Sequence, residues 1–427
     1  MKNDKTATFD RMESEVRSYS RSFPKLFNKA KGATIFSEDG KAYIDFLAGC
    51  SSLNYGHNDP DMQAALVDYV TADGIAHGLD MFTDAKEQFL AAYEDIILKP
   101  RGMEYKLMFT GPTGTNAVEA ALKLARKVKG RSNIIAFTNG FHGMTLGALA
   151  ATGNAGKRNG GGIDLNGVYH APFDGYFGPE IDTAEMLDRM LGDPSGGVDA
   201  PAAILVEPVQ GEGGLNAASP EWLKKIEAIA RKHDALFIVD DIQAGCGRTG
   251  SFFSFEAFGL SPDIVTQAKS LSGMGLPLAL TLIKPEYDIW TPAEHNGTFR
   301  GNNHAFVTAR IALEKFWRDE TFGKSVKAKG EHLKLRLGAI AAQHDLTVRG
   351  RGMMMGINAE SGEVAAAVCE QCFDNGLIIE TSGSHDEVVK VLCPLTIDIA
   401  QLDQGLDIIE NAFQAVLASD VSHVAAE

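Results

Sequence analysis

The segment Asp263-Ile-Val-Thr-Gln-Ala-Lys269-Ser-Leu-Ser-Gly-Met-Gly-Leu-Pro277 joins a β-branched run to a lysine and then to a turn rich in serine and glycine. It predicts a buried strand that carries one amine at its tip. Burial disfavours the charged form of a lysine and prepares the neutral amine for Schiff-base chemistry. Taken alone, a lysine such as Lys269 is far more often a strand-end residue that reaches solvent.

A second apolar run, Ala235-Leu-Phe-Ile-Val-Asp240-Asp241-Ile-Gln243, ends in an acid shortly before that lysine. Ligands of open α/β sheets bind beyond the carboxyl ends of the strands. An acid and an amine at neighbouring strand ends fit pyridoxal 5'-phosphate, whose aldehyde needs a lysine and whose ring nitrogen needs a carboxylate. We therefore expect Asp240 to keep the ring nitrogen protonated and Gln243 to reach the phenolic oxygen of the ring.

Short apolar runs alternate with amphipathic patterns from about residue 61 to 320, which indicates a mainly parallel α/β sheet with helices on both faces. The expected strands are Tyr105–Thr110, Asn133–Thr138, Ala202–Val209, Leu236–Asp240, Asp263–Ala268 and Leu278–Lys284. After residue 325, expected helices at Ser325–Gln343 and Gly362–Asn375 alternate with short strands, as in a smaller α+β domain. The N-terminal part predicts a helix at Arg11–Arg21 and a hairpin at Thr34–Phe46 with an Asp-Gly turn. We expect residues 1–60 to pack with the small domain, 61–320 to form the large domain and 321–427 the small domain.

The composition restricts the class of protein. A chain of 427 residues with 44% apolar residues can bury a large core, and a net charge of −16 argues against nucleic acid as a partner. We find no charged-then-apolar leader and no apolar run of about 18 residues, so we expect a cytoplasmic protein without membrane segments. The single C-x-x-C, Cys369 and Cys372, lacks a second pair, and we therefore expect no metal site.

The segment Thr110-Gly111-Pro-Thr-Gly114-Thr115-Asn116 lies between an expected strand and an expected helix. Backbone amides, a hydroxyl and the positive end of a helix dipole would form an anion cradle around Gly114 and Thr115. An ordinary N-capped turn is the alternative. The pattern is neither G-x-G-x-x-G nor a P-loop, which argues against a nucleotide.

Other polar segments follow strands at the same edge of the sheet. Phe141, in Asn139-Gly-Phe141-His142-Gly143, could stack on a flat cofactor, although taken singly such a phenylalanine is more often a core residue and such a histidine more often a hydrogen-bonded structural residue. Glu207-Pro-Val-Gln-Gly-Glu212 adds two carboxylates, which suit hydrolysis or polar contacts to a cofactor. Two further segments offer either plain loop structure or ligand contacts: Leu53-Asn-Tyr55-Gly-His57 and Glu294-His-Asn-Gly-Thr298-Phe-Arg300.

Together these segments resemble the class III aminotransferases, enzymes of fold type I that depend on pyridoxal phosphate. The likeness spans nearly the whole chain in the order of the family's motifs. It implies that Lys269 binds the cofactor and moves the substrate proton, and that Asp240 pairs with the ring nitrogen. The other implied cofactor contacts are Gly114, Thr115, Phe141, His142, Glu207, Gln243 and, from a partner subunit, Thr298. The resemblance therefore implies a homodimer or a larger homo-oligomer with shared active sites.

Within the family, several stretches resemble the branch that moves an amino group from glutamate to aspartate 4-semialdehyde, the first step of ectoine biosynthesis. These stretches are Glu13–Tyr19, Arg21–Pro24, Tyr43–Gly49, Leu53–His57, Thr110–Asn116 and Gly297–Asn303. The expected substrate contacts are Tyr55, Glu212, Arg300 and Lys390, and the residue that holds the substrate carboxylate is left open among Arg300, Lys390 and Arg351.

Two positions depart from related enzymes. Ornithine and 4-aminobutyrate transaminases commonly have an arginine where this chain has Lys390, and lysine is the poorer bidentate partner. Met144 replaces a substrate-binding arginine of the 4-aminobutyrate enzymes, which argues against that substrate. The alternatives are an ornithine or acetylornithine type of aminotransferase, an aminomutase, a catalytically silent protein that binds pyridoxal phosphate, and a hydrolase that uses Glu207 and Glu212.

Overall fold

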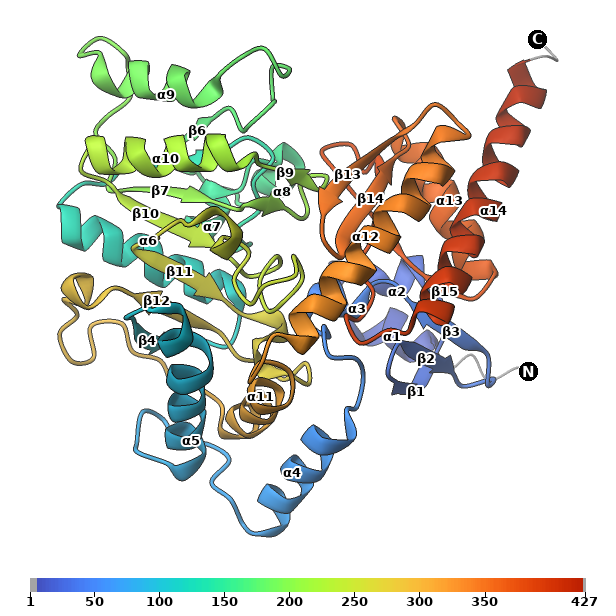
Figure 1. Ribbon diagram of the computed structural model, residues 1–427, viewed down its shortest axis with the longest axis horizontal. Coiled ribbons are helices and arrows are strands. Elements are labelled where there is room, and N and C mark those ends of the chain that lie inside the picture. The colour runs from blue at the N-terminus through green and yellow to red at the C-terminus, as the bar shows by residue number, and fades with distance from the viewer. Residues whose placement is uncertain (1–5, 425–427) are drawn as a thin grey trace.

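A seven-stranded sheet forms the centre of the larger part of the molecule in the computed structural model, which describes residues 6–424 (Figure 1). Its strand order is β4 (Lys106–Phe109), β12 (Leu280–Ile283), β11 (Ile264–Gln267), β10 (Leu236–Asp240), β7 (Ala203–Val206), β5 (Ile134–Phe137) and β6 (Val168–Ala171). Neighbouring strands are parallel except at β12, which runs antiparallel to both β11 and β4. The predicted α/β class with a mainly parallel sheet is confirmed.

The central strands are apolar at nearly every position because helices cover both faces of the sheet. Ile238 of β10 belongs to the cluster under α6 (Gly114–Lys129) and α7 (Leu146–Ala151). Its neighbours Phe237 and Val239 point to the opposite face. That face is covered by α5 (Asp84–Ala92), α9 (Thr183–Gly192), α10 (Pro220–Lys232) and α11 (Asn303–Phe316). Burial on both faces explains the absence of alternating polarity in these strands.

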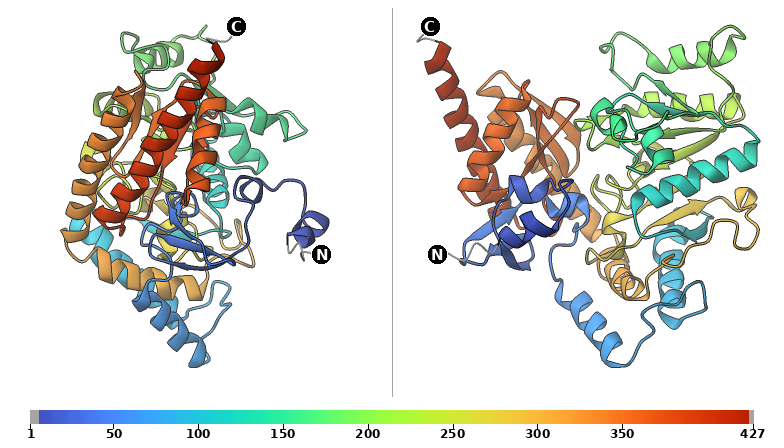
Figure 2. Two further views of the ribbon diagram at one scale, coloured as in Figure 1. Left: turned by 90° about the vertical axis from the view of Figure 1, so that its right-hand side faces the viewer. Right: turned by 180° about the vertical axis from the view of Figure 1, so that it is seen from behind.

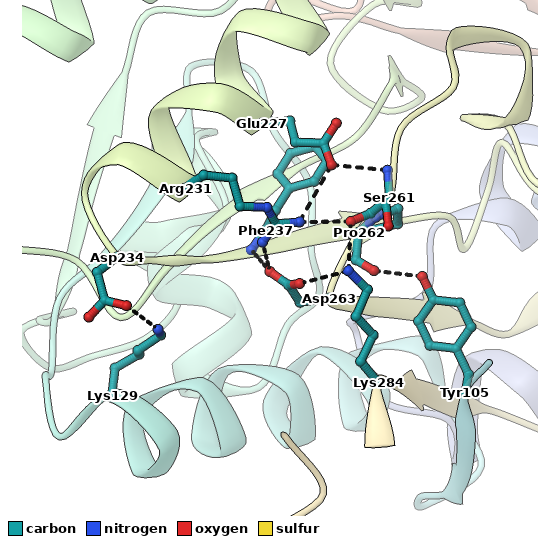
Figure 3. A network of polar contacts seen from close by, with 10 residues as sticks. All are labelled: Tyr105, Lys129, Glu227, Arg231, Asp234, Phe237, Ser261, Pro262, Asp263 and Lys284. Atoms are coloured by element: carbon teal, nitrogen blue, oxygen red, sulfur yellow. Dashed lines mark hydrogen bonds and ion pairs between the residues drawn. The ribbon is translucent and has the colours of Figure 1, made fainter. Parts of the chain in front are cut away.

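A buried acid fixes the relative position of β10 and β11 at their amino ends. Figure 3 shows Asp263, just before β11, between Arg231 of α10 and Lys284. Its carboxylate also accepts a hydrogen bond of 2.8 Å from the backbone N–H of Phe237. These contacts accompany a parallel register that sets Asp240 opposite Thr266. The two strands therefore end side by side, at the opposite edge of the sheet.

The N-terminal hairpin and the C-terminal segment form the smaller part of the molecule (Figure 2). One sheet has the order β1 (Phe27–Lys31), β2 (Thr34–Ser37), β3 (Ala42–Asp45) and β15 (Leu377–Ile378), and the other has β13 (Thr347–Arg351), β14 (Met354–Asn358), β17 (Val388–Val391) and β16 (Glu380–Ser382). Three helices pack on them: α12 (Thr321–Ala342), α13 (Gly362–Asp374) and α14 (Ile399–Val424). The parallel pairing of β3 with β15 joins the N-terminal and C-terminal segments directly.

The predicted helix at Arg11–Arg21 is wrong. Two short helices stand there instead, α1 (Ala7–Met12) and α2 (Tyr19–Ser22). Between them the hydroxyl of Ser14 accepts a hydrogen bond from the N–H of Val16, a local contact that competes with helical bonds. None of the helices between residues 6 and 424 combines the length and apolar character needed to span a bilayer.

Candidate active site

A cavity of about 460 Å³ opens beyond the carboxyl ends of β10 and β11. Its wall brings together most of the residues predicted from the sequence: Gly114, Thr115, Phe141, His142, Glu207, Glu212, Asp240, Gln243 and Lys269. Apolar side chains complete the wall, namely Met144, Ile242, Leu276, Pro277 and Leu278. The cavity lies where ligands of open α/β sheets bind.

Asp240, the last residue of β10, is 4% exposed and is held from three sides. One carboxylate oxygen contacts Nδ1 of His142 at 2.7 Å. The other oxygen accepts hydrogen bonds from the hydroxyl of Thr266, at 3.0 Å, and the N–H of Ile242, at 3.2 Å. Burial opposes protonation of His142, but its hydrogen bond with Asp240 and the negative charge of Asp240 outweigh burial and raise its pKa. The carboxylate is therefore fixed in orientation at the cavity wall.

Lys269 begins a single 3-10 turn, η4 (Lys269–Ser272), directly after β11. Its φ is +52°, in the left-handed region that costs a non-glycine residue about 1–2 kcal/mol. The next residue, Ser270, donates a 2.7 Å hydrogen bond to the carbonyl of Ser51 and accepts one of 2.9 Å from the N–H of Asn54. Such backbone strain persists where surrounding contacts fix it, and it concentrates at functional sites.

The start of α6 presents unpaired backbone amides to the cavity. The N-cap residue, Thr113, makes no side-chain cap, so the first turn lacks the usual acceptor. A Cβ on Gly114 would lie 3.0 Å from Ile242, so glycine permits the close approach of the two segments. The hydroxyl of Thr115 contacts that of Thr145 at 2.7 Å and also lines the cavity. Amides, hydroxyl and helix dipole form a cradle suited to a phosphate group.

The amide of Gln243 offers a second polar contact. Its Nε2 donates a 3.0 Å hydrogen bond to Glu212, while its oxygen is buried without a hydrogen-bond partner. A buried polar atom without a partner calls for an explanation, and a polar ligand in the cavity would supply one. The phosphate cradle, the fixed carboxylate of Asp240 and this amide together fit pyridoxal phosphate.

Glu207 is a buried carboxyl group that orders the loop of Phe141. It accepts hydrogen bonds from the N–H of Phe141, at 2.8 Å, and of Gly211, at 3.3 Å. Burial raises the pKa of Glu207 to about 7, and the charge of Asp240 acts in the same direction.

Glu212 is held ionised by a lysine behind it. Burial opposes ionisation of Glu212, but the charges of Lys390 and Lys269 lower its pKa to about 2. Lys390 is fully buried, lies 3.0 Å from Glu212 and is absent from the cavity wall. It also lies 2.9 Å from Glu380, so one ammonium group serves two carboxylates and its pKa is raised despite burial. Glu380 is not among the site residues predicted from the sequence, although an acid that ends the apolar run Leu377-Ile-Ile is a recognisable signal.

Some predicted substrate contacts lie elsewhere. Tyr55 is a core residue: its ring stacks on Phe316 with centroids 4.8 Å apart, and its hydroxyl accepts a 2.8 Å hydrogen bond from the indole N–H of Trp317. Tyr55 therefore packs in the core and does not line the cavity, which corrects its prediction as a substrate contact. Within one chain, three further side chains lie outside the cavity wall: Thr298, Arg300 and Arg351.

Thr298 is exposed, and Arg300 lines a separate cavity of about 360 Å³. Arg351 lies over the ring of Phe258 and donates a hydrogen bond to the carbonyl of Ser254. The contribution of Thr298 to a partner's site stays a prediction. Among the side chains of residues 6–418, no group of three histidine, cysteine or acidic residues is placed to hold a metal ion.

Comparison with known proteins identifies the family of this chain. The model of the class-III aminotransferases matches residues 16–413. The diaminobutyrate–2-oxoglutarate transaminases of Halomonas elongata and Vibrio parahaemolyticus are each 56% identical to this chain over 413 residues, which cover 95% and 96% of this chain and 98% of each relative.

Solved structures agree with this assignment. An ornithine aminotransferase from Toxoplasma gondii, described with partial occupancy of pyridoxal phosphate at its active site, superposes with a TM-score of 0.84 at 27% identity, over 97% of this chain and 94% of that one. A transaminase from the marine bacterium Virgibacillus has the same fold, with a TM-score of 0.87 at 20% identity over 97% of this chain and 99% of the other. This chain belongs to the class III aminotransferase family.

Proposed function

We propose that this protein uses pyridoxal 5'-phosphate to transfer the amino group of L-glutamate to L-aspartate 4-semialdehyde. The products are L-2,4-diaminobutyrate and 2-oxoglutarate, and the reaction is the first step of ectoine biosynthesis. The names of relatives that share 54–56% of their residues with this chain support the choice of substrates. The observation that carries the chemistry is the single cavity whose wall contains Lys269, Asp240 and the start of α6.

When bound, pyridoxal phosphate supplies an aldehyde that takes up an amine and a ring that withdraws electrons from the substrate carbon. The amides of α6 and the hydroxyl of Thr115 would hold the phosphate. Asp240 would hold a proton on the ring nitrogen, and its contacts with His142 and Thr266 would keep it in position. Phe141 would stack on the ring, and Gln243 would contact the phenolic oxygen.

Lys269 would bind the cofactor aldehyde and then move a proton between the substrate carbon and the cofactor. Its left-handed backbone conformation places it at the start of a short turn whose next residue, Ser270, is fixed by hydrogen bonds to Ser51 and Asn54. Glu212, with Lys390 behind it, would face the distal end of the substrate chain. The distal end of glutamate carries a carboxylate only. The distal end of 2,4-diaminobutyrate, which reacts at its 4-amino group, carries a carboxylate and an ammonium, so the Glu212–Lys390 pair must accommodate both kinds of end.

We further propose a homodimer or a larger homo-oligomer in which Thr298 reaches the partner's phosphate site. Two aromatic side chains support a subunit interface, because in one chain Phe82 is fully exposed and Phe299 is 66% exposed, and a partner subunit would cover such apolar surface. The division into residues 1–60, 61–320 and 321–427 is also a proposal, supported by the pairing of β3 with β15. The cytoplasmic location stays a prediction.

A product assay with glutamate and a panel of semialdehydes tests the function. We expect 2-oxoglutarate and 2,4-diaminobutyrate, with a higher kcat/KM for aspartate 4-semialdehyde than for glutamate 5-semialdehyde. The reverse order would favour an ornithine type of enzyme. The Lys269→Ala variant should lose both turnover and the visible absorbance of the bound cofactor. Absorbance without transfer to any aldehyde in the wild type would indicate a silent cofactor-binding protein.

A further inference from the structure

A left-handed turn lies against the loop that carries Lys269. The residues of α3 (Ala48–Ser51) have φ values of +46°, +57°, +55° and +72° in chain order. Only one of the four is glycine, so the conformation is unfavourable for the other three residues. A strained segment of this kind persists only where neighbouring groups hold it, and those groups point to its use.

Arg248 is the residue that holds the turn. It is fully buried, and its Nε donates a 3.1 Å hydrogen bond to the hydroxyl of Ser51. Its other nitrogens donate to the side-chain oxygen of Asn54 and to the carbonyls of Met353 and Cys393. The guanidinium thus links the turn to the C-terminal part of the chain.

No carboxylate within residues 6–418, whose side chains the structure describes, forms an ion pair with Arg248. Burial lowers the pKa of its guanidinium to about 10. An unpaired buried charge is expensive, and a packed apolar side chain would fill the same space at lower cost. The guanidinium of Arg248 carries several N–H donors, and it uses them to bind several neutral oxygens at once. We infer that this linking of segments is the reason for an arginine at this position.

The turn is itself hydrogen-bonded to the loop that carries Lys269. The hydroxyl of Ser270 donates to the carbonyl of Ser51 at 2.7 Å and accepts from the N–H of Asn54 at 2.9 Å. Ser270 directly follows Lys269, whose own φ is +52°. The hydroxyl of Ser51 also donates to the carbonyl of Gln243 at 3.1 Å. Two residues of the cavity wall are thus set by one turn.

We propose that Arg248 is a positioning residue for Lys269, acting through the Ser51–Ser270 contact to keep the amine aligned with the cofactor. The inference rests on the proposed role of Lys269. A misaligned amine changes both the rate of proton transfer and the protonation of the linkage that it forms with pyridoxal phosphate. It leaves the distal end of the substrate site intact, so kcat should change more than KM.

The test compares holoenzymes of the wild type, Arg248→Lys, Ser270→Ala and the double variant. One readout is the pH midpoint of the visible absorbance that depends on Lys269, and the other is single-turnover rate with glutamate. We expect each single variant to shift the midpoint and to slow turnover by about tenfold. The double variant should be slowed by little more than either single variant, because both act on one contact. A loss of about 100-fold in the double variant, as for independent sites, would overturn the proposal.

Arg126→Lys is the matched control. Arg126 is a half-buried arginine near the end of α6, and burial lowers the pKa of its guanidinium as well. It donates hydrogen bonds to the carbonyls of Ser132 and Gly167 and contacts no residue of the lysine loop. We expect wild-type midpoint and turnover from this variant, and equal effects at both arginines would overturn the proposal.

Ser51→Ala removes the acceptor of the Nε contact, together with the contacts of the hydroxyl to Asn54 and Gln243, and keeps the backbone carbonyl that Ser270 contacts, so it serves if Arg248→Lys does not fold. It should shift the midpoint in the same direction as Ser270→Ala, and an unchanged midpoint would overturn the proposal. The two proposals fail in different ways. A wild type without Lys269-dependent absorbance rejects the function, whereas a normal wild type with a normal Arg248→Lys rejects only the positioning role.

Discussion

Replacing Lys390 by methionine should destabilise the protein strongly. The change keeps the length of the side chain and removes the ammonium between Glu212 and Glu380. The pKa of Glu212 is about 2, against an ordinary value of 4.5. At about 1.4 kcal/mol for each pH unit, that difference corresponds to about 3 kcal/mol of stabilisation, to which Lys390 contributes most, with smaller contributions from Lys269 and Gln243. The figure agrees with the roughly 3–5 kcal/mol lost when one partner of a buried ion pair is removed.

The pH dependence gives the prediction its sign. In the wild type the pKa of Glu212 is lowered, so its stabilisation is complete above pH 4.5 and is lost only between pH 4.5 and 2. In Lys390→Met, Glu212 and Glu380 lose the ammonium that they share, and because burial opposes ionisation of Glu212, the loss of that charge raises the pKa of Glu212 above its ordinary value. The variant therefore gains stability as the pH falls from 8 to 5, whereas this site in the wild type does not. The difference in unfolding free energy between the wild type and Lys390→Met should therefore become smaller as the pH falls from 8 to 5.

Urea unfolding of the two holoenzymes at several pH values between 5 and 8 measures the difference. The control is Lys390→Met combined with Glu212→Gln, which removes one of the stranded charges and should recover part of the loss. A stability difference that is the same at pH 5 and pH 8, or a double variant no more stable than Lys390→Met, would refute the electrostatic explanation.

Three further variants test the site. Asp240→Asn should lower kcat by about 100-fold or more at saturating cofactor in stopped-flow half-reactions with glutamate, because a neutral amide does not hold a proton on the ring nitrogen. Thr115→Ala should raise the Kd for pyridoxal phosphate about tenfold in a fluorescence titration, since a hydrogen bond to a charged group contributes about 1.5–3 kcal/mol. The raised pKa of Glu207, about 7, stabilises the fold below pH 4.5, and this contribution is lost as the pH rises through 7. Glu207→Gln should therefore flatten the fall in Tm of the apoprotein between pH 5 and 8, and an unchanged slope would contradict the assignment.

The ends of the central strands could be predicted from the sequence because burial on both faces leaves unbroken apolar runs. The run at Leu236–Asp240 has the observed bounds of β10, and the run before Lys269 differs from β11 by one residue at each end. Polar residues that directly follow such runs meet at one edge of a parallel sheet, which brought Asp240, Gln243 and Lys269 into one cavity wall.

Partly exposed and long-range features could not be predicted in the same way. The edge strand β6 carries Tyr169 and His170 and is only partly buried, so it has no apolar run. Lys390 and Glu212 meet across 178 positions of the sequence. Arg248 donates hydrogen bonds to the backbone carbonyls of Met353 and Cys393. Every residue has such a carbonyl, so the pattern of side chains does not show which ones will accept these bonds.

The reversed direction of β12 has a consequence for substrate range. Because β12 returns antiparallel to β11, the intervening loop is tethered at both ends within one sheet. This loop supplies Leu276, Pro277 and Leu278 to the cavity wall. Side chains at these three positions can be exchanged to reshape the space for the substrate, while the contacts of Ser270 hold Lys269 at the other end of the same loop and the pairing of β10 with β11 holds Asp240. Pocket shape and reaction chemistry can thus be altered separately in this enzyme, and residues 276–278 are the natural target for changing its selectivity.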